Sequence, residues 1–112
     1  IAGDSAGGNL AVVTAMRARD EGLPQPAGLV LMSPVLDLTF SGASIERNDG
    51  FDPMFRAANI RALTKWYGKG MDLRDPRLSP IYGRLTGLPP QSMSSCFRFP
   101  IPTSSMTSSL TG

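Results

Sequence analysis

The chain has 112 residues, of which 41% are hydrophobic, and a formal net charge of +2. This length allows one domain at most, and so small a charge gives no support to a nucleic-acid or membrane-surface partner. No stretch is long and apolar enough to predict a membrane span, and the single cysteine, Cys96, excludes a disulfide within the chain.

The chain opens on Gly3-Asp4-Ser5-Ala6-Gly7, a Gly-x-Ser-x-Gly pattern that leads directly into a helical stretch. This pattern is typical of a nucleophile elbow, in which a serine stands on a sharp turn between a strand and a helix. We expect Gly3 and Gly7 to remove Cβ atoms that would clash in the turn. Ser5 is then the predicted nucleophile, and the Ala6 backbone N–H is the predicted oxyanion donor. The alternative is a glycine-rich turn without catalysis.

A strand end and a long helix are predicted around this motif. Ile1 and Ala2 would be the last residues of a strand, and the helix would run from Gly8 to about Glu21. Small apolar residues cover most of its first three turns, so we expect it to be largely buried. Gly22, followed by a leucine and Pro24, indicates where the helix ends.

Residues 28–33 form a continuous apolar run, Gly-Leu-Val-Leu-Met-Ser, which Pro34 ends. Such a run is typical of a strand buried on both faces of a parallel sheet. Strand, helix and strand together make a crossover unit, so the predicted fold class is α/β. We interpret Asp37, just after this strand, as a turn residue.

The middle of the chain predicts a loop and then a second helix. Residues 40–50 lack clear periodicity and read as loop. The helix would begin either at Asp52-Pro53 or at Arg56-Ala57, and it would end at Gly68 or Gly70.

One face of this second helix is apolar. Ile60, Leu63 and Tyr67 share the face, and Trp66 extends it. Aromatic residues on an amphipathic helix are usually core anchors, so we expect this face to be buried and favour that interpretation over substrate binding. Residues 72–80 read as a loop, since two X-Pro steps keep the backbone extended.

Three segments resemble the hormone-sensitive-lipase-like esterases, a group also called α/β-hydrolase fold 3. They are GDSAGGNLA at residues 3–11, SPVLDLT at 33–39 and GRLTGLPP at 83–90. The resemblance implies that residues 1–90 are a partial α/β-hydrolase domain. It also implies hydrolysis of a carboxylic ester through an acyl-enzyme on Ser5.

The resemblance further implies a small-molecule ester or lactone substrate, with no cofactor and no metal. In the resembling family the region before the second helix packs near the substrate pocket. A pocket role is therefore the alternative interpretation for three apolar residues there: Phe51, Met54 and Phe55.

The chain contains no histidine, the usual base of a serine hydrolase. In the α/β-hydrolase order the histidine comes last, and the triad acid and the upstream oxyanion loop are also missing. Because the chain starts at Ile1, in the middle of a pattern, we expect it to be an internal piece of a longer enzyme. Two alternatives remain open: a non-catalytic fragment, and a peptidase or thioesterase on the same fold.

The composition changes abruptly after Pro90. Residues 91–112 contain seven serines, three threonines and no acidic residue, and Pro100 and Pro102 interrupt them. The resembling family has a strand here, which runs into the loop that bears the catalytic acid. We expect no such strand from Gln91 onward. We predict a non-family tail that is either disordered or translated out of frame.

Overall fold

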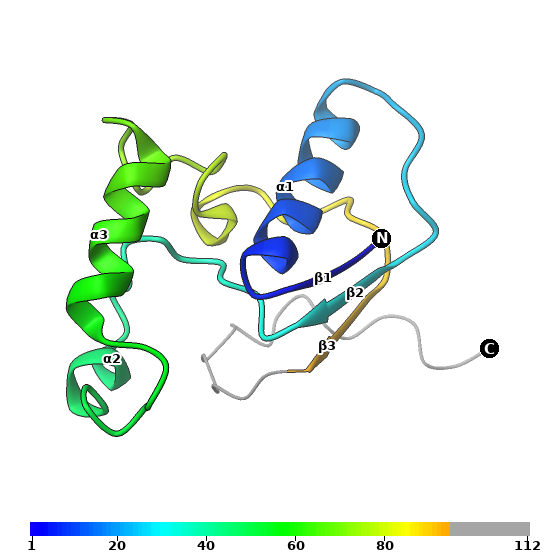
Figure 1. The fold of residues 1–112 in the computed structure, drawn as a ribbon. Helices are drawn as coiled ribbons and strands as arrows, with labels where there is room; N and C mark the ends of the chain where they lie inside the picture. Colours follow the sequence, from blue (N-terminus) through cyan, green and yellow to red (C-terminus); the bar gives the residue numbers. More distant parts are fainter. Residues whose placement is uncertain (95–112) are drawn as a thin grey trace.

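The computed structural model describes residues 1–94 (Figure 1). Residues 95–112, including Cys96 and most of the predicted tail, lie outside the described residues. None of the described helices is long and apolar enough to cross a membrane. The elements in chain order are β1 (Ala2–Asp4), α1 (Ala6–Asp20), β2 (Leu29–Met32), α2 (Ala43–Arg47), α3 (Ala57–Gly68), the 3₁₀ turn η1 (Pro80–Tyr82) and β3 (Gln91–Ser94).

The three strands form one parallel sheet in the order β1-β2-β3. Gly3 lies opposite Leu31, and Leu31 in turn lies opposite Met93. Helix α1 connects the first two strands, so the predicted crossover unit and the α/β fold class are confirmed.

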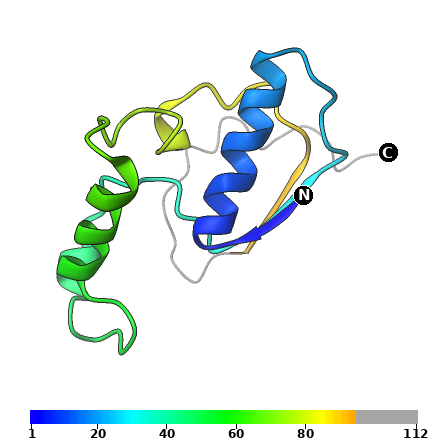
Figure 2. The ribbon, with the colours of Figure 1, turned by 45° about the horizontal axis from the view of Figure 1, so that its top comes forward.

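The core lies between α1 and one face of the sheet (Figure 2). Leu29 and Leu31 point into it and are each 1% exposed, whereas Val30 and Met32 on the opposite face are 51% and 48% exposed. The expectation that β2 is buried on both faces is therefore wrong for the described residues, because α1 covers only one face. The helix contributes four buried side chains to this core: Ala11, Val12, Ala15 and Met16.

Helix α1 begins two residues earlier than predicted and ends at Asp20. The Leu23 N–H donates to the Ala18 carbonyl at 2.8 Å, and the Gly22 N–H donates to the Arg19 carbonyl at 3.1 Å. This pair of bonds is a Schellman motif, and it requires the positive φ of +68° that Gly22 adopts. The predicted stop signal therefore acts as expected.

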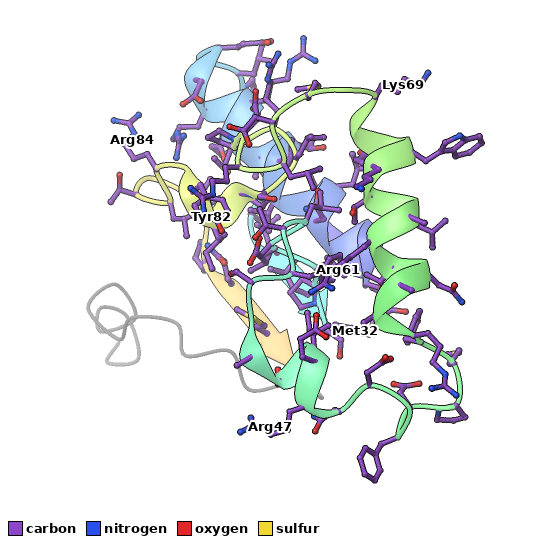
Figure 3. All side chains as sticks on the ribbon, turned by 90° about the vertical axis from the view of Figure 1, so that its left-hand side faces the viewer. Met32, Arg47, Arg61, Lys69, Tyr82 and Arg84 are labelled. Carbon is purple, nitrogen blue, oxygen red and sulfur yellow. The ribbon has the colours of Figure 1, made fainter. Side chains whose placement is uncertain are left out.

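Helices α2 and α3 form a lobe beside the sheet (Figures 1 and 2). Helix α2 lies where the sequence predicted only loop, and Arg61 extends from α3 toward it and pairs with Glu46 (Figure 3). Helix α3 starts at Ala57, the second of the two predicted positions. There Asp49, eight residues earlier, accepts the Ala57 N–H at 3.0 Å. It ends at Gly68, the first of the two predicted ends.

The apolar face of α3 is exposed, so the prediction that it supplies core anchors is wrong for the described residues. Trp66 is 83% exposed, and Leu63 and Tyr67 are 64% and 59% exposed. The buried residues of α3 are three small ones: Ala57, Thr64 and Gly68. A Cβ at Gly68 would lie 3.2 Å from a Leu73 methyl, so a small residue lets α3 approach the loop that follows it.

The prediction that no strand starts at Gln91 is also wrong. Residues 91–94 pair in parallel with β2, and Met93 packs against the core. An edge strand held by backbone hydrogen bonds needs few apolar side chains, which is why a serine-rich segment can fill this place.

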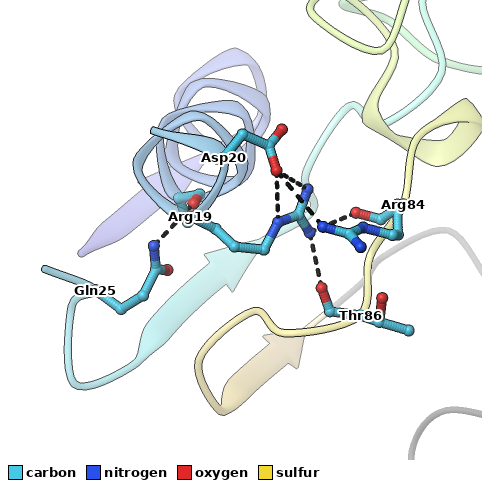
Figure 4. Close-up of polar contacts among 6 residues, drawn as sticks. Arg19, Asp20, Gln25, Arg84 and Thr86 are labelled. Carbon is cyan, nitrogen blue, oxygen red and sulfur yellow. Dashed lines mark hydrogen bonds and ion pairs between the residues drawn. The ribbon is translucent and has the colours of Figure 1, made fainter. Parts of the chain in front are cut away.

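Arg19 anchors the segment that leads into β3 (Figure 4). Its Nη1 donates to the Arg84 carbonyl at 2.6 Å and to the Thr86 carbonyl at 2.8 Å, and its side chain is 12% exposed. Arg19 also forms an ion pair with Asp20 at 2.8 Å. The end of α1 is thereby tied to the loop that delivers the third strand.

Candidate active site

Ser5 stands at the junction of β1 and α1, on a strained turn. Its φ is 51° and its ψ is −116°, a backbone conformation that residues other than glycine rarely adopt. Its N–H donates to the Met32 carbonyl at 2.9 Å, which holds the turn against the end of β2. This is the geometry that the Gly-x-Ser-x-Gly pattern predicted, with the serine half-buried where the helix starts.

The glycines around Ser5 differ in how crowded they are. A Cβ at Gly3 would lie 2.2 Å from the Gly7 carbonyl oxygen, so Gly3 is required for the close approach of strand and helix. Among residues 1–94, a Cβ at Gly7 would meet nothing within 4 Å, so the clash expected there is wrong for the described residues. The sequence analysis missed Gly8, whose Cβ would lie 2.7 Å from the Cβ of Pro34.

The backbone N–H groups at the start of α1 divide into two sets. Those of Gly8 and Asn9 donate to the Ser5 carbonyl at 3.1 and 3.2 Å. Ala6 is the first residue of the helix, and an N–H at that position has no acceptor within its own helix. The Ala6 N–H therefore lies at the positive end of the helix dipole, one residue after Ser5. Asp4, the remaining motif residue, ends β1 and is exposed.

Asn9 is a buried polar residue in the first turns of α1, with 6% of its surface exposed. Its Nδ2 donates to the Val35 carbonyl at 2.7 Å and to the Leu78 carbonyl at 2.8 Å. Sequence reasoning missed it, although one signal was present. An asparagine inside a stretch of small apolar helix residues is a polar group that needs buried partners.

Asp37 accepts four hydrogen bonds from residues close to it in the chain and a longer one, at 3.4 Å, from the Tyr82 hydroxyl. Its carboxylate takes the Thr39 N–H and hydroxyl at 2.8 and 2.6 Å, and the Ser41 N–H and hydroxyl at 3.2 and 2.7 Å. Burial raises the pKa of Asp37, but these hydrogen bonds outweigh it, so the net shift is downward. The contacts are those of a turn-forming aspartate, as interpreted from the sequence.

The three pocket candidates belong to the segment between α2 and α3, which lies away from the β1–α1 turn in both ribbon views (Figures 1 and 2). Phe51, Met54 and Phe55 are 87%, 75% and 46% exposed. The described part of the chain therefore does not bring them to the serine. Within residues 1–94, no group of three or more His, Cys, Asp or Glu side chains is placed to hold a metal ion.

Comparison with known proteins places this geometry among hydrolases. A family model described as alpha/beta hydrolase fold matches residues 1–98. An acetyl-hydrolase of Streptomyces hygroscopicus is 43% identical over 90 residues, which make up 80% of this chain and 30% of the relative. The crystal structure of the HSL homologue EstE7, from a metagenome library, superposes with a TM-score of 0.79 at 40% identity, over 83% of this chain and 32% of that one.

An esterase from the bacterial hormone-sensitive lipase (HSL) family also superposes, with a TM-score of 0.78 at 36% identity. This match covers 82% of the present chain and 31% of the esterase. The chain thus spans about a third of the length of the relatives that it matches. The resemblance to hormone-sensitive-lipase-like esterases predicted from the sequence is confirmed.

Proposed function

Because this chain belongs to the α/β-hydrolase family, we propose that it is the nucleophile-bearing part of a serine carboxylester hydrolase. The observation that carries the proposal is the strained Ser5 at the start of α1, whose φ of 51° and ψ of −116° lie outside the left-handed helical region. A non-glycine residue keeps such a conformation only where the surrounding structure enforces it, and such residues cluster at active sites. Relatives named acetyl-hydrolase and esterase support an ester as the substrate.

In the proposed reaction the Ser5 hydroxyl oxygen attacks the carbonyl carbon of a small ester or lactone. A base takes the hydroxyl proton and then gives it to the alkoxide as the ester bond breaks. The alcohol departs, and the acyl group stays bound to the Ser5 oxygen. Water hydrolyses this acyl-enzyme by the same steps. The Ala6 N–H donates to the oxyanion that forms in each half of the reaction, with support from the α1 dipole.

The chain has no histidine, so the base of this reaction must come from another part of a longer enzyme. The exposed face of β2, where Val30 and Met32 are about half exposed, supports the same interpretation, since parallel sheets are normally covered on both faces. The second candidate is therefore that residues 1–112 alone form a fragment without catalytic activity.

Substitution of Ser5 in the intact enzyme tests the proposal. We expect Ser5→Ala to lower kcat for p-nitrophenyl butyrate by roughly 10³-fold or more, as removal of a triad member does. Thr14→Ala, at an exposed position of α1, is the control and should keep kcat. Phenylmethylsulfonyl fluoride should label the tryptic peptide that ends at Arg17, and mass spectrometry would identify it. Near-normal turnover by Ser5→Ala would refute the assignment.

We propose that the partial hydrolase domain covers residues 1–90 and that a change of reading frame follows it. The strand at Gln91–Ser94 and the family match to residue 98 both lie beyond Pro90, so the nucleotide sequence from codon 91 to codon 98 is where the change of frame is sought. The coding sequence is the test: a shift by one base is expected to open a frame that encodes a strand and an acidic loop. If neither alternative frame does so, the proposal of a frame change fails.

A further inference from the structure

The Ser5 carbonyl is the point at which two separate segments hold the elbow. From α1 it accepts the N–H groups of Gly8 and Asn9, and from the segment after β2 it accepts the Val35 N–H at 3.1 Å. The strained backbone of Ser5 therefore depends on where Val35 lies. A shift of Val35 would release one of the bonds that hold the Ser5 carbonyl, and with it the ψ of −116°.

The Asn9 side chain determines where Val35 lies. Its amide donates to the Val35 carbonyl at 2.7 Å, while its backbone N–H shares the Ser5 carbonyl with the Val35 N–H. Ser5, Asn9 and Val35 thus form a closed ring of three hydrogen bonds. The second amide bond, to the Leu78 carbonyl at 2.8 Å, fixes the Asn9 side chain itself from a segment 69 residues away.

We propose that Asn9 is a positioning residue for the nucleophile, acting through Val35 on the Ser5 backbone. This inference rests on the proposed function of Ser5. Asn9 is 6% exposed and its amide already has two acceptors, so it does not touch substrate. Only a neutral amide fits the ring, because an aspartate would place a carboxylate against two carbonyl oxygens and donate to neither.

The test uses Asn9→Asp and Asn9→Ser in the intact enzyme, with Ser79→Ala as the matched control. Ser79 is also fully buried, and its hydroxyl also makes two hydrogen bonds, from the Leu38 N–H at 2.8 Å and to the Leu73 carbonyl at 2.6 Å. All three variants should lose thermal stability. Only the Asn9 variants should lose kcat, by about 10- to 100-fold with KM within about twofold, because a misplacement of about 1 Å can cost 10²-fold.

Inactivation by phenylmethylsulfonyl fluoride gives a second readout, because this small reagent reports the reactivity of Ser5 directly. We expect its rate constant to fall with kcat in the Asn9 variants and to stay unchanged in Ser79→Ala. Normal kcat in folded Asn9 variants, or equal losses in Ser79→Ala, would overturn the inference. Failure of both Asn9 variants to fold would assign Asn9 a purely architectural role and overturn it as well. An active Ser5→Ala enzyme would instead refute the proposed function.

Discussion

The two glycines of the Gly-x-Ser-x-Gly pattern are expected to respond oppositely to alanine. In Gly3→Ala the new Cβ would lie 2.2 Å from the Gly7 carbonyl oxygen and 2.7 Å from the Gly8 nitrogen, both backbone atoms. Ordinary contact starts at 3.4 Å, so β1 and α1 would have to separate by about 1.2 Å. In Gly7→Ala the new Cβ would meet no atom of the described residues within 4 Å.

The size of each effect follows from these distances. Overpacking of this kind costs about 1–3 kcal/mol, and a 1 Å displacement of the turn that carries Ser5 can lower kcat by about 10²-fold. Gly7 is the second residue of α1, where alanine is favoured over glycine by at most about 1 kcal/mol, the value for a helix interior. Gly3→Ala should therefore be less stable than the parent, and Gly7→Ala equally or more stable.

The assay is thermal unfolding of the intact enzyme followed by circular dichroism, with kcat for p-nitrophenyl butyrate measured on the same samples. Gly8→Ala gives a further comparison, because its Cβ would lie 2.7 Å from the Pro34 Cβ and should destabilise as well. If Gly7→Ala lowered the unfolding temperature as much as Gly3→Ala, the reasoning from local crowding at the elbow would be refuted.

Three further predictions concern stability. Arg19→Ala should lower the free energy of unfolding by about 1.5–3 kcal/mol, measured by heat or urea, because the carbonyls of Arg84 and Thr86 lose a charged donor. The control is Arg17→Ala, whose side chain is 77% exposed and whose loss should change the free energy of unfolding by less than about 1 kcal/mol. Equal losses in the two variants would contradict this prediction. Hydrogen bonds from Arg77 lower the pKa of Asp75 from 3.8 to about 2, so its stabilising contribution is complete above pH 3.8 and is lost as the pH falls toward 2. Asp75→Asn should remove that part of the acid dependence of unfolding, and an unchanged profile would speak against it. Residues 1–112 alone should show neither a cooperative denaturant transition by circular dichroism nor ester hydrolysis, and either result would disprove this.

The sequence alone was sufficient to predict features whose physical cause lies within a few consecutive residues. The elbow at Ser5, the end of α1 at Gly22 and the strand at 29–32 follow from steric preferences and periodicity that act locally. Gly22, for example, adopts φ of +68° in a motif that involves only its near neighbours. The α/β class followed from the order of these elements, since a strand, a helix and a strand in succession favour a parallel crossover.

Tertiary structure alone decided features that depend on residues far apart in the chain. Gly8 is crowded only because Pro34 lies against it, and Asn9 finds acceptors that are 26 and 69 residues away. The same reason explains two of the failed predictions, the burial of the α3 face and the absence of a strand at Gln91. An apolar face on α3 does not specify what covers it, and the serine-rich residues 91–94 form a strand because the backbone of β2 and the Arg19 anchor hold them at its edge.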